Sequence, residues 1–184
     1  MADQRRTATH AVSAPFPVAG GTVASLHIHP AEPGAGLQAM EALTLVAGKG
    51  IAEDRRYFDR TSKHTGKPNR RQVSLIEREQ IAEHAATLGL QSIAPGAVRA
   101  NIETTRVDLH SLLGQDVEVG EVILRFHSPR TPCPKMDALC SGLRELMRNN
   151  RQGVLAEVVR SGTIRVGDLI RSRDAQAPEV EKLD

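Results

Sequence analysis

The chain has 184 residues, of which 40% are hydrophobic and 25% charged, and its formal net charge is +2. This length predicts one domain whose core needs neither disulfides nor a structural metal. The charge is too small to favour wrapping of DNA, and three Phe and one Tyr offer few rings for stacking bases. Nineteen Arg against five Lys instead favour an anionic small-molecule ligand, because the guanidinium matches phosphate and carboxylate bidentately.

The ends of the chain predict where the domain lies. Residues 1–18 are polar, Ala-rich and contain Pro, which predicts a flexible arm, and residues 174–184 predict a flexible tail, leaving 19–173 as the domain. The chain has no apolar run of the roughly 20 residues that a membrane helix needs, and no secretory signal. With only two cysteines, we expect a cytoplasmic protein without a disulfide framework or a membrane partner.

The first half of the domain predicts strands followed by a helix. Alternating β-branched residues predict a strand over 21–30 that stops at Pro30, and a second strand is expected around 41–47. The basic, apolar-poor segment 53–71 predicts a long functional loop. A strand over 72–76 is expected to lead into a helix, with Ser74 and Glu77 as its capping box and Gly89 as its stop.

The second half predicts mostly strands and one more helix. Its expected elements are a strand over 99–104, a turn after it, a hairpin over 117–127 that turns at Gly120-Glu121, a helix from Pro134 to about Arg148, and strands over 154–160 and 167–172. Many short strands with two helices predict a mainly β, α+β domain of barrel type and argue against a doubly wound sheet.

One cysteine stands out in the segment SPRTPCPKMD, residues 128–137. Pro132 and Pro134 stiffen the backbone around Cys133, and Pro134 suits the first position of a helix, so Cys133 is the expected N-cap. Free N–H groups at a helix start, together with Arg130 and Lys135, would favour a thiolate. The pattern fits a nucleophile, a redox centre or a ligand for a soft metal, and it also fits simple packing.

The second cysteine is expected to be structural. Cys140 falls on an apolar stripe of the predicted helix, which is formed by Met136, Leu139, Cys140, Leu143, Leu146 and Met147. The spacing of the two cysteines does not match a zinc motif. A catalytic pairing of Cys133 with His64, His110 or His127 stays open, because sequence alone does not place them in space.

Several segments in order resemble a known family. They carry an acidic-arginine turn, an R-x-N-I strand, a glycine hairpin, the Pro-Cys corner and a terminal G-x-I-x-x-G-D. The segments are GKGIAEDRRY (48–57), RRQVSLIERE (70–79), PGAVRANIETT (95–105), LLGQDVEVGEVILRFHSPRTPCPKM (112–136) and RQGVLAEVVRSGTIRVGDLI (151–170). This combination resembles the MOSC domain, the module named for the C-terminal part of molybdenum-cofactor sulfurases, in its standalone bacterial type.

The resemblance implies a closed β-barrel of the pyruvate-kinase β-barrel-like type and a pyranopterin-molybdenum cofactor. In family members that reduce N-hydroxylated compounds, the matching cysteine is a molybdenum ligand, which would make Cys133 the metal-binding and catalytic residue. The candidate partners of the cofactor's phosphate are Arg55, Arg71, Arg99 and Arg130, and Asn101 is the candidate for the polar edge of the pterin. Asp54 could instead be structural, either holding Arg55 or capping a turn.

Two functions follow as expectations from this resemblance. The first is a molybdenum-dependent oxidoreductase subunit that reduces a small N-hydroxylated substrate with electrons from a separate reductase. The second is a sulfur carrier that bears a persulfide on Cys133, supplied by a pyridoxal-phosphate cysteine desulfurase for assembly of a metal-sulfur cofactor. Both functions require a reachable thiolate.

Overall fold

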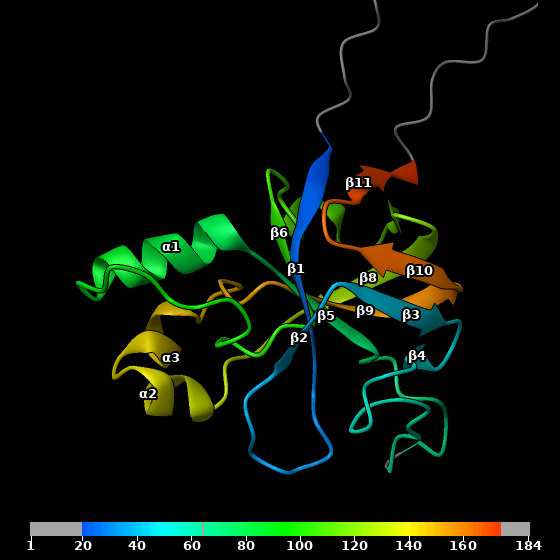
Figure 1. The fold of residues 1–184 in the computed structure, drawn as a ribbon, viewed down its shortest axis with the longest axis horizontal. Coiled ribbons are helices and arrows are strands. Elements are labelled where there is room, and N and C mark those ends of the chain that lie inside the picture. Colours follow the sequence, from blue (N-terminus) through cyan, green and yellow to red (C-terminus); the bar gives the residue numbers. More distant parts are fainter. Residues whose placement is uncertain (1–19, 64, 174–184) are drawn as a thin grey trace, which may run out of the picture.

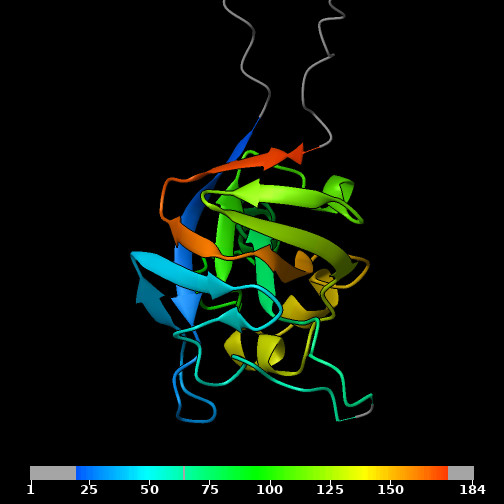
Figure 2. The ribbon, with the colours of Figure 1, turned by 90° about the vertical axis from the view of Figure 1, so that its right-hand side faces the viewer.

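The computed structural model describes residues 20–63 and 65–173. Within them, seven strands close a mixed β-barrel (Figures 1 and 2). In hydrogen-bonded order these strands are β11 (Leu169–Ser172), β7 (Asp116–Val119), β8 (Val122–Pro129), β9 (Val154–Arg160), β5 (Val73–Glu77), β6 (Ile102–Thr105) and β1 (Gly21–Ile28). The barrel closes where β1 pairs with β11, with Gly21 opposite Ile170. The expected closed, mainly β barrel is therefore confirmed.

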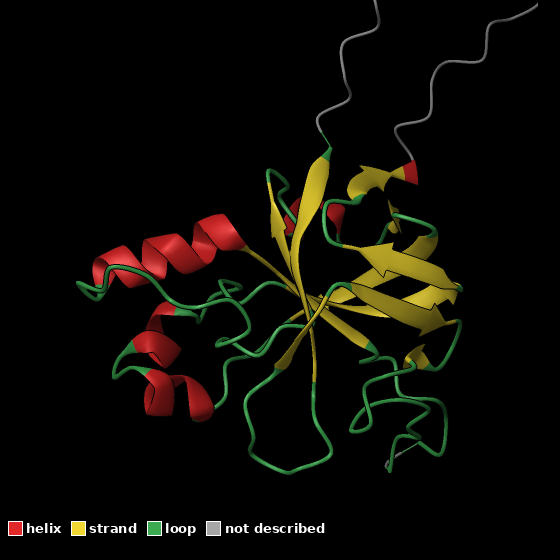
Figure 3. Ribbon diagram, in the orientation of Figure 1, coloured by secondary structure: helices red, strands yellow, loops and turns green. Residues whose placement is uncertain are grey.

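The other strands lie beside the barrel. The short β2 (Gln38–Met40) pairs with β1, while β10 (Gly162–Arg165), β3 (Ala42–Val46) and β4 (Gly50–Ile51) form a separate three-stranded sheet. Among the barrel pairings only β5 with β6 is parallel, and this pair is joined through α1 (Arg78–Thr87). Figure 3 shows the α-helices gathered on one side of the barrel.

Two apolar cores hold these parts together. The barrel interior is filled mostly by Val, Leu and Ile from all its strands, with Phe126 as the one large aromatic side chain in this cluster. A second core lies between the barrel and the helices, where Ile76, Ile81, Met136 and Leu143 are fully buried. Burial of aliphatic side chains thus supplies the stability that the scarce aromatic residues do not.

The start of α1 differs from the expectation. The predicted capping box is wrong, because the N-cap is Glu77, without a side-chain cap, and Ser74 lies inside β5. The Ser74 hydroxyl donates to Asn101 Oδ1 at 2.8 Å, so it links β5 to the residue just before β6 and does not cap the helix. Gly89 ends the helix as expected, with a φ of 68°.

The predicted second helix is interrupted. The structure has α2 (Lys135–Leu139) and α3 (Leu143–Leu146) in its place, because Cys140 is extended and Gly142 takes a φ of 87°. The apolar stripe is therefore broken: Met136, Leu143 and Met147 are buried, while Leu139 is 45% exposed. The 3-10 helix η1 (His110–Leu112) occupies the expected turn after β6.

A buried histidine makes the fold sensitive to acid. His84 in α1 is 1% exposed, its Nε2 bonds the carbonyl oxygen of Arg151 at 2.9 Å, and burial lowers its pKa. Burial also lowers the pKa of His27. Because the unfolded chain takes up these protons first, stability is present above about pH 6.5 and is lost as pH falls toward the lowered folded pKa values.

We therefore expect the free energy of unfolding, measured with urea, to be lower at pH 5 than at pH 7. The loss should be smaller in His84→Gln, which cannot be protonated. Glu77, whose pKa is raised by burial, contributes in the opposite direction, so an equal change between the two pH values in the native chain and in His84→Gln is the result that would contradict this explanation.

Candidate functional site

The cysteine corner borders a cavity of about 250 Å³. Segments that are distant in sequence form its wall: the turn after Asp54, the start of β5, the turn before β6, and the chain from Arg130 to Met136. The cationic side chains in the wall are Arg56, Arg71, Arg99, Arg130 and Lys135. Among the described residues, the wall contains no Asp or Glu. Its charge therefore favours an anionic ligand.

Cys133 lies in this wall and is exposed. It sits between the end of β8 and the start of α2, and its carbonyl oxygen accepts a hydrogen bond from the Met136 N–H at 3.0 Å. The N-cap of α2 is Pro134, one residue later than expected, and the helix has only five residues. A helix this short has a weak dipole, so the positive charge around Cys133 comes mainly from the cationic side chains of the wall.

Arg130 is fixed by main-chain oxygens. Its two terminal nitrogens donate to the carbonyls of Gln152 (3.2 Å), Val98 (3.4 Å) and Arg99 (3.0 Å). Burial, assisted by the charge of Arg71, lowers its pKa to about 10. Arg130 therefore stays charged at neutral pH and joins the cysteine corner to the turn before β6.

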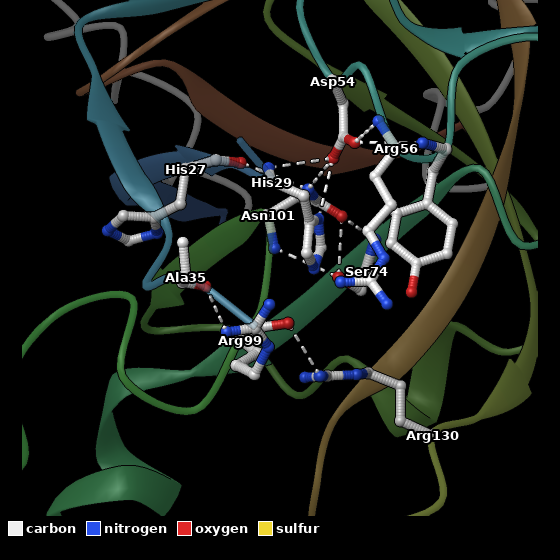
Figure 4. Close-up of polar contacts among 10 residues, drawn as sticks. His27, His29, Ala35, Asp54, Arg56, Ser74, Arg99, Asn101 and Arg130 are labelled. Carbon is white, nitrogen blue, oxygen red and sulfur yellow. Dashed lines mark hydrogen bonds and ion pairs between the residues drawn. The ribbon is translucent and has the colours of Figure 1, made fainter. Parts of the chain in front are cut away.

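Arg99 is held in an unusual backbone conformation. Its φ is 61°, a left-handed value that is costly for a residue with a side chain. Its own carbonyl accepts from Arg130, and its Nη1 donates to the Ala35 carbonyl at 2.9 Å (Figure 4). The expected strand over 99–104 therefore begins only at Ile102, and Arg99 is in a turn at the cavity wall.

Asn101 lines the cavity, but its side chain is fully engaged by protein. Its Oδ1 accepts from the N–H and hydroxyl of Ser74, and its Nδ2 donates to the His27 carbonyl and to Asp54 Oδ2, both at 3.2 Å. These contacts fasten β6 to β5 and to the turn after β4. The geometry gives Asn101 a supporting position in the wall.

Asp54 organises the turn that carries Arg56 and Tyr57. Its Oδ1 accepts from the N–H groups of both residues at 3.1 Å, and its Oδ2 accepts from the N–H and ring Nδ1 of His29 (Figure 4). Burial opposes ionisation, but these hydrogen bonds and His29 hold the pKa of Asp54 below its usual value. Asp54 thus caps a turn, one of the two structural roles considered from sequence, and it does not hold Arg55.

The predicted cationic residues fall into two groups. Arg71, Arg99 and Arg130 line the cavity together with Cys133, whereas Arg55 is exposed and lies outside the wall. The neighbouring Arg56 lines the cavity where Arg55 was expected, and the Arg56 guanidinium lies 5.8 Å from the centre of the Tyr57 ring. Sequence reasoning missed Arg56, Tyr57 and His29, because the direction of each side chain depends on how Asp54 folds the turn.

The histidines proposed as partners of Cys133 are not in the described wall. His127 Nε2 bonds the carbonyl of Arg70 at 2.9 Å, and His110 belongs to the turn between β6 and β7. His64 lies outside the described residues. The histidine that does line the cavity is His29, whose Nδ1 is already bonded to Asp54 at 2.8 Å.

The fold and cavity define a small β-barrel protein with a cationic hollow beside an exposed thiol. A family model described as the MOSC domain matches residues 61–171, more than half of the chain, so the protein belongs to the MOSC domain family. This family is associated with molybdenum-cofactor binding or sulfur transfer. The expected domain over 19–173 contains the matched range, and the predicted arm over 1–18 and tail over 174–184 lie outside the described residues.

Solved structures share this fold. The YuaD protein from Bacillus subtilis has a TM-score of 0.68 at 22% identity, over 83% of this chain and 95% of its own. YiiM from Escherichia coli has a TM-score of 0.58 at 19% identity, over 86% of this chain and 70% of its own. YiiM from Geobacillus stearothermophilus has a TM-score of 0.62 at 13% identity, over 83% of this chain and 74% of its own. Comparison with curated protein sequences gives no match.

Among the described residues, no helix has both the length and the apolar character required to cross a membrane.

Proposed function

We propose that this protein binds a molybdenum cofactor through Cys133 and the cationic cavity, and serves as the catalytic subunit of a reductase of N-hydroxylated compounds. The observation that supports this proposal most is the convergence of an exposed thiol with five cationic side chains in one cavity wall without a carboxylate. A phosphate-bearing cofactor needs cationic partners, and a soft metal accepts a thiolate ligand.

The residues present fit such a group. Within the described chain, the side chains of Arg56, Arg71 and Lys135 make no hydrogen bond to protein, so their donors remain available to a phosphate. Arg99 and Arg130 already donate hydrogen bonds to carbonyls, so they would attract the phosphate through their charge more than through new hydrogen bonds. The wall therefore has cations with unbonded donors as well as cations that are hydrogen-bonded to carbonyls.

In this function the cofactor supplies the change of oxidation state that the side chains cannot supply. Cys133 would provide a thiolate at the mouth of the cavity, and Arg56, Arg71 and Lys135 would neutralise and orient the phosphate. The fixed Arg130 would keep a positive charge beside the thiolate. Electrons would come from a separate reductase, because the chain has no flavin, haem or iron–sulfur motif.

A second candidate is a sulfur carrier with a persulfide on Cys133. Exposure of this thiol favours the idea, because a desulfurase partner must reach it, and the cationic wall would stabilise an anionic persulfide. In this case the protein would carry one extra sulfur atom in place of molybdenum.

The test is the composition and activity of full-length protein purified without oxygen from cells that make the cofactor. We expect about one molybdenum and one pterin per chain, and reduction of an N-hydroxylated amidine with a reduced dye as electron donor. Protein from cells unable to make the cofactor is the control and should be inactive. Absence of both molybdenum and pterin, with a sulfur adduct in the intact mass, would replace this proposal with the sulfur-carrier function.

A further inference from the structure

A second cluster of possible metal ligands lies outside the cationic cavity. One ligand atom from each of Glu77, Asp108 and His110 falls within 4.8 Å of the others. Glu77 ends β5 and is the N-cap of α1, while Asp108 and His110 come from the turn between β6 and β7. None of the three lines the cavity that contains Cys133.

Two buried polar atoms in this cluster have no partner. Glu77 is only 6% exposed, and its Oε2 is buried without a hydrogen bond within the described chain. His110 Nε2 is buried and unpartnered in the same way. Buried polar atoms are almost always satisfied, so two such atoms on residues of one cluster point to a group that the polypeptide does not supply.

The missing group is best explained as a cation. Glu77 and Asp108 form no salt bridge with any residue in the described ranges, so the buried carboxylate of Glu77 has no full positive charge beside it. Burial raises the pKa of Glu77, whereas a divalent ion would favour its ionised form, and two ionised carboxylates would then balance the charge of that ion. A buried carboxylate without a counter-charge is otherwise costly.

The main chain already orients the carboxylates. Glu77 Oε1 accepts from the Leu109 N–H at 3.0 Å, and Asp108 Oδ1 accepts from the N–H groups of His110 (3.0 Å) and Ser111 (3.2 Å). Each carboxylate therefore has one oxygen fixed by backbone and the other available. Hydrogen bonds of this kind hold the ligands of known metal sites in position.

We propose that Glu77, Asp108 and His110 form a binding site for a divalent cation of the zinc type. The mixture of one imidazole nitrogen with carboxylate oxygens suits zinc better than magnesium, which prefers oxygen ligands alone. Tetrahedral zinc needs ligand atoms about 3.3 Å apart, so small side-chain rotations close the site. Water would complete the coordination, and exposed Asp108 gives the ion access.

Bound zinc would join the start of α1 to the turn before β7. Since the ion binds the folded chain, it should stabilise the barrel by mass action. At a zinc concentration of 100 times Kd, the expected rise in Tm is about 8 °C for a domain of this size.

The experiment uses full-length protein stripped with a chelator and alkylated at its accessible thiols, so that cysteine does not bind the probe. Zinc is titrated by calorimetry and by thermal unfolding. Asp108→Asn, which retains the oxygen that accepts from His110 and Ser111, and His110→Gln should each weaken one zinc site by about tenfold or more and reduce its Tm shift by about half or more. Glu32→Gln, an exposed change outside the cluster, should retain both.

The outcomes are decisive in both directions. The proposal is supported if both cluster variants lose the same one of the zinc-binding sites seen in the native protein while their circular dichroism stays native. If one variant fails to fold, the result of the other is enough to decide. Unchanged zinc affinity in a folded cluster variant would overturn the proposal. An equal Tm shift with magnesium would overturn the assignment to a zinc-type cation.

Discussion

Replacing Cys133 with serine is expected to reduce the molybdenum content of anaerobically purified protein to below about a tenth of the native value. Serine preserves the size of the side chain, but its hydroxyl does not ionise at neutral pH and is a harder ligand than a thiolate. The exposed position of Cys133 means that the change should not disturb packing. Metal analysis, with circular dichroism to confirm the fold, measures the effect.

Cys140→Ser is the matched control. Cys140 is half-buried at the C-cap of α2 and packs against the second core, and it is not in the cavity wall. We expect this variant to retain molybdenum and to lose only a little stability. If Cys133→Ser kept its molybdenum, ligation through this sulfur would be excluded. A loss of equal size in both variants would show that the metal content depends on stability and not on a ligand.

The fold was predictable where local pattern and tertiary packing agree. The strand expected over 21–30 is present but ends at Ile28, and the hairpin at Gly120-Glu121 and the strand over 154–160 are present as expected. Apolar residues of each of these strands fill the barrel interior. The helix after Pro134 was wrong in length. Its apolar spacing continues through Cys140, but the extended backbone of Cys140 ends α2, and the left-handed Gly142 begins α3.

The cavity was predictable in the types of residue that line it more than in its geometry. The Pro-Cys corner and the excess of Arg indicated an exposed thiol and an anionic ligand, and Arg71, Arg99 and Arg130 do line one cavity with Cys133. Choosing Arg56 over Arg55 requires knowledge of the turn that Asp54 caps. The Asn101 side chain forms its hydrogen bonds with Ser74 and His27, which lie on other strands, and no local sequence pattern reveals these contacts.

The backbone that supports Arg130 also depends on one glycine. Gly153 comes just before β9 with a φ of 75°, and its carbonyl accepts from the Arg130 N–H at 2.9 Å. A Cβ at this position would overlap the carbonyl oxygen of Leu75 and lie 2.7 Å from the Cα of Ile76. Both contacts are with the backbone of β5, which cannot rotate away as a side chain would.

We therefore expect Gly153→Ala to lower the free energy of unfolding by about 4 kcal/mol, because steric overlap in the barrel adds to the cost of a left-handed residue. Gly167→Ala is the matched control: its φ is 91°, and nothing lies within 4 Å of its added Cβ. Only the backbone cost of about 1–2 kcal/mol should remain there. Urea unfolding of the two variants measures the difference. Equal losses would show that backbone conformation alone sets the cost, and that β5 can move away from Gly153 without weakening the barrel.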